Sequence, residues 1–185
     1  MKRVIVLIVM TLVAIPVCAQ LGPGVVEASI SASLQSVSKG GGSSSTNILI
    51  SPRVGFFLHD GLEIEPELVF FVPDESDVPY MVNGNVAYNF LSSSKAYPFL
   101  LVGYGIANTV PFFGIPFSRY DFTVGVLNIG GGMKALLSER VAIRVEYRFQ
   151  KFSGEGPQQG YYPYVYTSKA DYQLHTFQFG FSVLL

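Results

Sequence analysis

Two β-strands and the turn between them are encoded in the stretch NIGGGMKALLSERVAIRVEYRFQKF, from Asn128 to Phe152. In its second half, every second residue from Val145 to Phe149 is apolar, while every second residue from Arg144 to Arg148 is charged. An alternation with a period of two places the two sets on opposite faces of a strand. The short link Leu137–Arg140 has the length of a hairpin turn, so the stretch predicts an antiparallel hairpin.

The same period of two recurs along the rest of the chain. We predict eight strands, near residues 25–35, 47–56, 62–70, 80–90, 97–108, 122–136, 141–152 and 175–185. The links at 38–45, 72–79, 109–120 and 153–170 are long and rich in Gly, Ser and Pro, whereas those at 58–61, 92–96 and 137–140 are tight. Short turns at one end and long loops at the other are typical of an up-and-down antiparallel transmembrane β-barrel, here all-β with eight strands.

The composition of the two faces predicts which of them lies inside the barrel. A soluble lipocalin-like barrel would alternate too, with its apolar face inside and a surface that is about a quarter to a third charged. Here the polar face is mostly Gly, Ser, Asn and Ala, which suits a narrow interior. The apolar face is bulky, and its aromatic residues fall toward strand ends, as membrane girdles do. These are Phe56, Phe70, Tyr80, Tyr88, Phe90, Phe122, Tyr147 and Phe149.

The N-terminus is typical of an export signal. Lys2 and Arg3 precede an apolar run, and a small-residue cleavage site ends at Ala19. We therefore expect a signal peptide at 1–19 and a barrel domain at 20–185. An uncleaved helical anchor is disfavoured because the run is shorter than the roughly 18 residues that span a bilayer. A lipoprotein signal at Cys18 is disfavoured by Val17, which stands where such signals have a small residue.

Composition excludes several function classes. Cys18 is the only cysteine among the 185 residues, so the mature chain has no thiol or disulfide chemistry. Without Lys2 and Arg3, ten basic and thirteen acidic residues remain, a formal charge of −3, which is no signature of nucleic-acid binding. Gly130–Gly132 precede Lys134, but they lack the P-loop spacing and open no helix. We expect no cofactor and no metal.

The quoted stretch resembles the Gly-rich strand, tight turn and Arg-x-Glu-x-Arg strand of the small outer-membrane β-barrel superfamily, which includes the membrane domain of outer membrane protein A. The ending HTFQFGFSVLL, from His175 to Leu185, resembles the last strand of that family, whose terminal residue is typically Phe and serves as an assembly signal. The resemblance implies a place in the cell outer membrane of a Gram-negative bacterium. It implies contact with outer-membrane lipid and with the outer-membrane assembly machinery.

Nine charged residues on the polar face form the best-specified candidate site. All lie within the periplasmic half of the barrel or near its midplane, and Glu63, Glu65 and Glu67 should face Arg144 and Arg148 across the lumen. We interpret them as a neutralised structural network, because unpaired buried charges are costly. A proton or ion pathway is the alternative. The nine are Glu27, Arg53, Glu63, Glu65, Glu67, Lys134, Arg144, Glu146 and Arg148.

The two histidines offer little catalytic chemistry. His59 stands in a tight turn beside Asp60. His175 could serve as the base of a triad like that of outer-membrane lipid A deacylases, which need a serine hydroxyl within reach of the imidazole. Phe177 occupies the neighbouring position on the same face. We therefore predict that the chain is no enzyme.

Our leading hypothesis is a non-enzymatic barrel, structural or surface-interacting through its extracellular loops. A small-solute pore or hydrophobic-ligand conduit is the alternative, and a lipid-modifying enzyme comes third. Aromatic clusters in two long loops are candidate contacts for an unidentified partner. They are Phe112, Phe113, Phe117 and Tyr120 in one loop, and Tyr161, Tyr162, Tyr164 and Tyr166 in the other.

Overall fold

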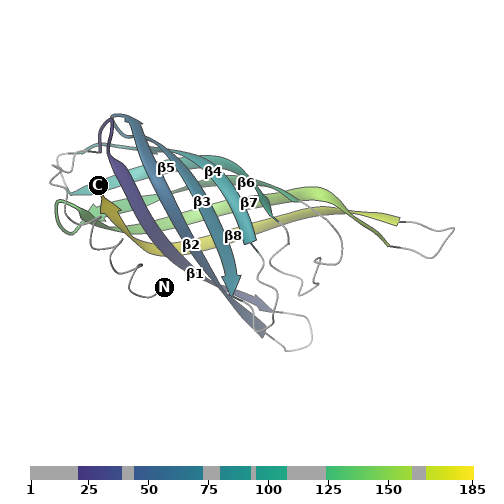
Figure 1. The fold of residues 1–185 in the computed structure, drawn as a ribbon. Helices are drawn as coiled ribbons and strands as arrows, with labels where there is room; N and C mark the ends of the chain where they lie inside the picture. The colour runs from purple at the N-terminus through teal and green to yellow at the C-terminus, as the bar shows by residue number, and fades with distance from the viewer. Residues whose placement is uncertain (1–20, 39–43, 73–79, 93–94, 108–123, 160–165) are drawn as a thin grey trace, which may run out of the picture.

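The chain forms a closed barrel of eight antiparallel strands in which β1 pairs with β8 (Figure 1). The computed structural model describes residues 21–38, 44–72, 80–92, 95–107, 124–159 and 166–185. The strands are β1 (Val26–Ser38), β2 (Ser44–His59), β3 (Leu62–Val72), β4 (Tyr80–Asn89), β5 (Ala96–Ala107), β6 (Val124–Leu136), β7 (Val141–Gln159) and β8 (Tyr166–Leu184). The predicted fold class is confirmed. Among the described residues, no helix is long and apolar enough to cross a membrane.

The last hairpin is longer than the sequence predicted. We placed a loop at 153–170, but β7 and β8 pair from Ser153 with Asp171 out to Gln159 with Tyr166. The prediction was wrong for two reasons. A two-stranded ribbon in water needs no apolar face, so the period of two is lost, and the Gly and Pro residues of this segment are typical of loops. A register shift between Glu155 and Gln158 accommodates them. Likewise, β1 and β2 extend into the predicted link at 38–45, where Ser38 pairs with Ser44.

The apolar face of the barrel points outward, as predicted. Along β4 the residues alternate strictly between exposed and buried, from Tyr80 outward to Asn89 inward. Large apolar side chains stay exposed around the wall, with Leu100 at 61% and Phe179 at 62%. Such a continuous apolar surface suits lipid rather than water. One of the predicted girdle residues, Phe122, lies outside the described residues.

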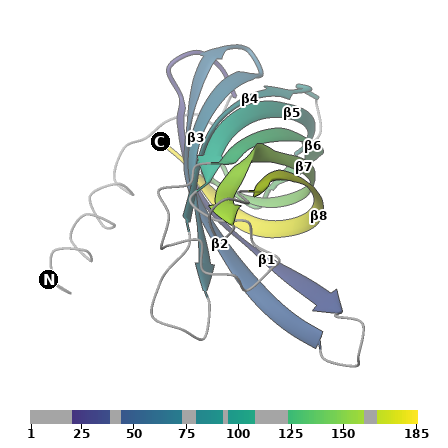
Figure 2. The ribbon, with the colours of Figure 1, turned by 90° about the vertical axis from the view of Figure 1, so that its right-hand side faces the viewer.

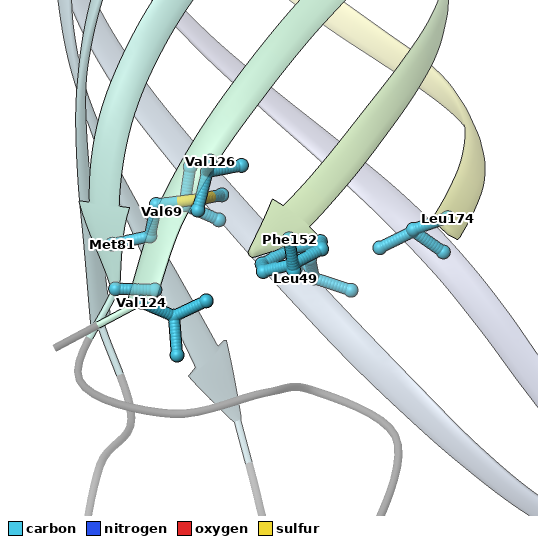
Figure 3. Packing of buried hydrophobic residues seen from close by; sticks show 8 residues of the cluster. Leu49, Val69, Met81, Val124, Val126, Phe152 and Leu174 are labelled. Atoms are coloured by element: carbon cyan, nitrogen blue, oxygen red, sulfur yellow. The ribbon is translucent and has the colours of Figure 1, made fainter. Parts of the chain in front are cut away.

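The interior is more apolar than the sequence pattern suggested. A buried cluster that we call the long-loop layer lies near the long connections (Figure 3); it comprises Leu49, Val69, Met81, Ala107, Val124, Val126, Phe152 and Leu174. A second cluster, the short-turn layer, comprises Leu21, Val25, Phe57 and Leu184, with Tyr97 and Leu136 packed against it. Between these two layers the interior is mostly small and polar, as expected, but a third buried cluster of Ala87, Phe99 and Leu101 lies there as well.

Residues before β1 help to close the short-turn end. Leu21 and Val25 are buried, and the segment they bound is hydrogen-bonded to the β2–β3 turn region. The Gly24 amide donates to the Phe57 carbonyl at 3.0 Å, and the Phe57 amide donates to the Val25 carbonyl at 3.0 Å. The amide of Gly61, which has a φ of +73°, donates to the Leu21 carbonyl at 2.9 Å. The short-turn layer is thus fixed by backbone hydrogen bonds as well as by packing.

We expect Gly132→Ala to destabilise the barrel by about 1–3 kcal/mol, because the added methyl group overpacks the interior. A Cβ at Gly132 would lie 2.9 Å from Glu146 Cα and 3.0 Å from Phe99 Cε1, and it would also collide with the Val145 carbonyl. Gly84→Ala is the control, because a Cβ there meets nothing closer than the Tyr104 carbonyl at 4.0 Å. Denaturant unfolding in lipid vesicles measures both; equal stabilities would contradict the packing described here.

Candidate functional site in the barrel lumen

Nine charged side chains meet between the two apolar layers. They come from β1, β2, β3, β6 and β7, and none is more than 3% exposed. They are the nine residues that the sequence placed on the polar face: Glu27, Arg53, Glu63, Glu65, Glu67, Lys134, Arg144, Glu146 and Arg148. All nine side chains point into the lumen of the closed barrel, which brings them together.

Arg144 on β7 reaches across the lumen to Glu65 on β3. Its two terminal nitrogens donate to the two oxygens of this carboxylate, Nη2 to Oε2 at 3.0 Å and Nη1 to Oε1. Its Nε donates to Glu146 Oε2 at 2.9 Å. A bidentate pair fixes both partners in a plane. The contact therefore ties opposite walls of the barrel together.

Two arginines and two glutamates form a closed square beside this pair. Arg148 donates to Glu67 Oε2 at 2.5 Å and to Glu146 Oε1 at 2.6 Å. Arg53 donates to Glu67 Oε1 at 2.8 Å and to Glu146 Oε2 at 2.7 Å, and also to the amide oxygen of Gln178. Each carboxylate thus accepts from both guanidinium groups. This arrangement gives each buried charge the partners without which burial would be costly.

Lys134 completes the network on the side of the short-turn layer. Its Nζ lies 2.7 Å from Glu27 Oε2 and 2.7 Å from Glu63 Oε2. The rings of Phe57 and Phe99 lie 5.5 Å and 5.7 Å from the same nitrogen, within the range of a cation–π contact. Neither ring was predicted to lie at this site. Their inward register was the available signal, since each stands on the polar face of its strand.

A series of hydrogen-bonded amide side chains extends from the charged residues toward the long-loop layer. Asn83 and Asn85 donate to Glu67 Oε2 at 2.9 Å and 3.1 Å. Asn128 donates to the Asn83 oxygen at 3.1 Å, and Gln150 donates to the Asn128 oxygen at 2.7 Å. These hydrogen bonds satisfy most of the buried amide groups, although Asn85 Oδ1 is buried without a hydrogen-bond partner. The three asparagines were predicted to face inward, but the role of these amides as partners of the network was not predicted.

Three of the carboxylates have the spacing of a metal site. Ligand oxygens of Glu27, Glu63 and Glu65 lie within 4.8 Å of one another. However, the Lys134 ammonium group stands 2.7 Å from the first two of these residues and 3.7 Å from the third. A side chain of this chain already supplies the cation, so the cluster is assigned to the ion-pair network.

The two histidines lie away from the lumen. His175 is exposed on the outer wall, where its Nδ1 is 2.6 Å from the Tyr147 hydroxyl and its ring packs against Phe149. Its hydrogen bond is therefore made to a tyrosine, and the serine that a triad requires is not part of this contact. His59 ends β2 at the short-turn end and is exposed.

Most of the predicted loop contacts fall outside the described residues. These are Phe112, Phe113, Phe117, Tyr120, Tyr161, Tyr162 and Tyr164. Tyr166 begins β8 and pairs with Gln159. The predicted signal peptide at 1–19 also lies outside the described residues and stays a prediction.

An eight-stranded barrel with a lipid-facing apolar wall and a charge-filled interior defines a small outer-membrane barrel protein. The chain belongs to the family of the outer membrane protein beta-barrel domain, whose model matches residues 5–183. Its place in the outer membrane of a Gram-negative bacterium follows from this membership. Among curated proteins, no sequence matches the chain.

Solved structures with the same fold include three bacterial outer-membrane proteins. The N-terminal β-barrel domain of Pseudomonas aeruginosa OprF is 14% identical over 89% of this chain and 99% of that chain, with a TM-score of 0.59. Neisserial surface protein A is 12% identical over 86% and 96%, with a TM-score of 0.58. OprG from Pseudomonas aeruginosa is 12% identical over 89% and 98%, with a TM-score of 0.52. At these identities the likeness is one of fold.

We expect Arg144→Ala combined with Arg148→Ala to destabilise the barrel by about 3–5 kcal/mol or more, because Glu65, Glu67 and Glu146 lose buried partners. The control is Lys95→Ala, an exposed cation in the link before β5, which should change stability by less than about 0.5 kcal/mol. Denaturant unfolding measures both. A double variant as stable as the parent would show that the pairs are not structural.

Exchanging the two charges of the bidentate pair, Glu65→Arg with Arg144→Glu, should recover part of the stability that either single reversal removes. The lumen would again hold opposite charges at the same depth. If the exchanged variant were as unstable as the sum of the single reversals, the direct pairing of these two positions would be contradicted.

Proposed function

We propose that this chain is a closed, non-enzymatic outer-membrane barrel whose function is carried by its extracellular loops. The observation that supports this most is the filling of the lumen. An ion-pair network spans it between β3 and β7, an apolar layer lies on either side, and amides fill the space toward the loops.

Energetics favour a closed lumen over a pore. A path for ions through the network would have to separate the Arg144–Glu65 pair and the square formed by Arg53, Arg148, Glu67 and Glu146. Breaking one buried pair by removing a partner costs about 3–5 kcal/mol. Two such breaks would hold the open state below about one in ten thousand molecules. The pore and the hydrophobic-ligand conduit are thereby disfavoured as main functions.

The surroundings of the barrel supply the remaining proposed partners. Lipid contacts the outward apolar residues, whose backbone groups are satisfied within the closed ladder. The outer-membrane assembly machinery is proposed to recognise the last strand, β8, which runs to Leu184. No catalytic arrangement supports enzyme activity in the described part of the chain, where His175 bonds to Tyr147.

The purified protein should conduct ions poorly or not at all in planar bilayers. Single-channel recording tests this, with the Arg144→Ala and Arg148→Ala double variant as the comparison if it folds. The variant loses two of the three guanidinium groups at this level and keeps Arg53, so we expect at most brief conductance. Steady, large conductance of the wild-type protein would show that the charges line a path.

The loops should carry any partner contact. Deleting the tips within 112–120 and 160–165 should leave a folded barrel in the membrane, because loop tips tolerate change far better than ladders do. The variant should lose the cell-surface binding that the intact gene restores to a deletion strain. Unchanged binding, with the shortened protein present at the surface in equal amount, would overturn the assignment of function to the loops.

A further inference from the structure

The nine buried charges of the lumen do not balance. The square formed by two arginines and two glutamates holds two charges of each sign. Beside it three carboxylates meet two cations, so the described part of the lumen has one negative charge too many if every group is ionised. An unpaired charge at this burial is costly, and a group so placed tends to become neutral. The five groups outside the square are Glu27, Glu63, Glu65, Lys134 and Arg144.

Glu63 is the carboxylate with the fewest cationic partners. Each of the other four lies within 3.8 Å of nitrogens from two or more cationic side chains. For Glu63 the described residues offer one ion pair, in which Lys134 Nζ lies 2.7 Å from Oε2. The same nitrogen lies 2.7 Å from Glu27 Oε2, so its single charge is divided between two carboxylates. The surplus negative charge therefore falls on Glu63.

The backbone places the Glu63 carboxyl group beside Glu27. Strands β1, β2 and β3 follow one another along one side of the barrel (Figure 2). Between the two glutamates, β2 presents Gly55, which pairs with Glu27. A Cβ at Gly55 would collide with Glu63 Oε1, so the lack of a side chain there lets Glu63 reach across β2. Ligand oxygens of Glu27 and Glu63 lie within 4.8 Å of each other.

Two oxygens at this place have no hydrogen-bond partner. Glu63 Oε2 accepts from Lys134 Nζ at 2.7 Å and from Asn89 Nδ2 at 3.0 Å. Glu63 Oε1 and Glu27 Oε1 are buried, and neither accepts a hydrogen bond within the described part of the chain. Two ionised carboxylates cannot satisfy each other, because both are acceptors only. A protonated carboxyl group has an O–H to donate.

We infer that the closed lumen binds one proton at neutral pH, which Glu63 holds on Oε1 and donates toward Glu27 Oε1, directly or through one water. The bound proton brings the sum of the lumen charges to zero. It also gives both oxygens a partner, since a water with two hydrogen bonds of about 2.8 Å spans the distance between them. The barrel thus takes up a proton as it folds, at the end of the lumen near the short-turn layer.

The groups that face Glu63 favour a proton over a metal ion. Lys134 on β6 stands between the carboxylates, and Arg144 on β7 lies 3.8 Å from Glu27. A metal ion would have to approach these cations closely, and a divalent ion would leave the lumen with a positive charge. The other strands present no acid or base here except the phenol of Tyr97. Their inward residues are Gly55 and Phe57 on β2, Asn89 on β4, Tyr97 and Phe99 on β5, and Leu184 on β8.

Unfolding should release this proton. In the unfolded chain Glu63 is exposed, and an ordinary glutamate, with a pKa of about 4.3, is ionised at neutral pH. The folded state then binds one proton more than the unfolded state, so the free energy of unfolding falls as the pH rises. For one proton, the unfolding equilibrium constant rises by up to about tenfold per pH unit. The stability that the proton contributes is complete below about pH 4 and is lost toward alkaline pH.

The test compares Glu63→Gln with Glu67→Gln in the full chain folded in lipid vesicles. Both residues lie on the inward face of β3. Between about pH 5.5 and 7.5, the unfolding equilibrium constant of the parent should rise with pH relative to that of Glu63→Gln, by up to about tenfold per unit. At neutral pH, Glu63→Gln should be at least as stable as the parent, because glutamine needs no proton. Glu67→Gln should unfold roughly tenfold more readily or worse, because Arg53 and Arg148 lose a carboxylate.

Infrared spectroscopy of the folded protein detects the proton without reference to stability. A protonated carboxyl group has a C=O stretch that a carboxylate lacks. At neutral pH the parent should show one such band, which Glu63→Gln should lose and Glu67→Gln should keep.

Three results would overturn the inference. One is a parent protein without the infrared band at neutral pH. Another is a Glu63→Gln variant that loses as much stability as Glu67→Gln. The third is a loss of stability in the parent, but not in Glu63→Gln, when choline replaces sodium at constant ionic strength, since a metal ion would then occupy the place of the proton. Conductance and loop-dependent surface binding are separate readouts, so failure here leaves the proposed function standing.

Discussion

The absence of water in the bilayer core is the constraint on which the whole structure depends. Every backbone group at that depth must be bonded within the protein, so the eight strands close on themselves. An eight-stranded closure leaves an interior with room only for side chains. The residues that face inward must therefore fill the space and satisfy one another. The contact between Arg144 and Glu65 and the square around Glu146 meet both demands at once.

The layering of the lumen follows from the same constraint. The buried charges find partners on neighbouring strands and across the lumen, and the contacts across the lumen form where β3 and β7 face each other. Toward both ends of the barrel the inward positions are apolar, and the long-loop and short-turn layers shield the network from water. Phe99 is an apolar residue that contacts the charge network directly, since the Arg144 guanidinium carbon lies 4.4 Å from the centroid of its ring. The barrel interior therefore resembles the core of a soluble protein, except that its centre is polar.

Much of the fold and the residues of the network could be predicted from the sequence, because a period of two fixes the face of every residue and turn lengths fix its depth. Counting from the turns placed Glu65 and Arg144 at matching heights. The sequence could not show that Phe57 and Phe99 line the charges, because periodicity gives a side chain's face but not its neighbours. Residues 153–170 were wrongly predicted to be a loop, because a two-stranded ribbon in water needs no alternation of apolar and polar residues. The β1–β8 ladder ends at the pair Ser33 with Gln178. Its length depends on the paths of the β1–β2 and β7–β8 hairpins, which no local sequence pattern encodes.

The central claim is that the charges close the lumen, and ordered water in a high-resolution crystal structure tests it most directly. Within the described residues, Glu27 Oε1 and Glu63 Oε1 are buried without a hydrogen-bond partner, so isolated waters are predicted beside them. The account predicts no continuous file of water between the short-turn and long-loop layers. A connected chain of waters running past Arg144 and Arg148 from one layer to the other would contradict it.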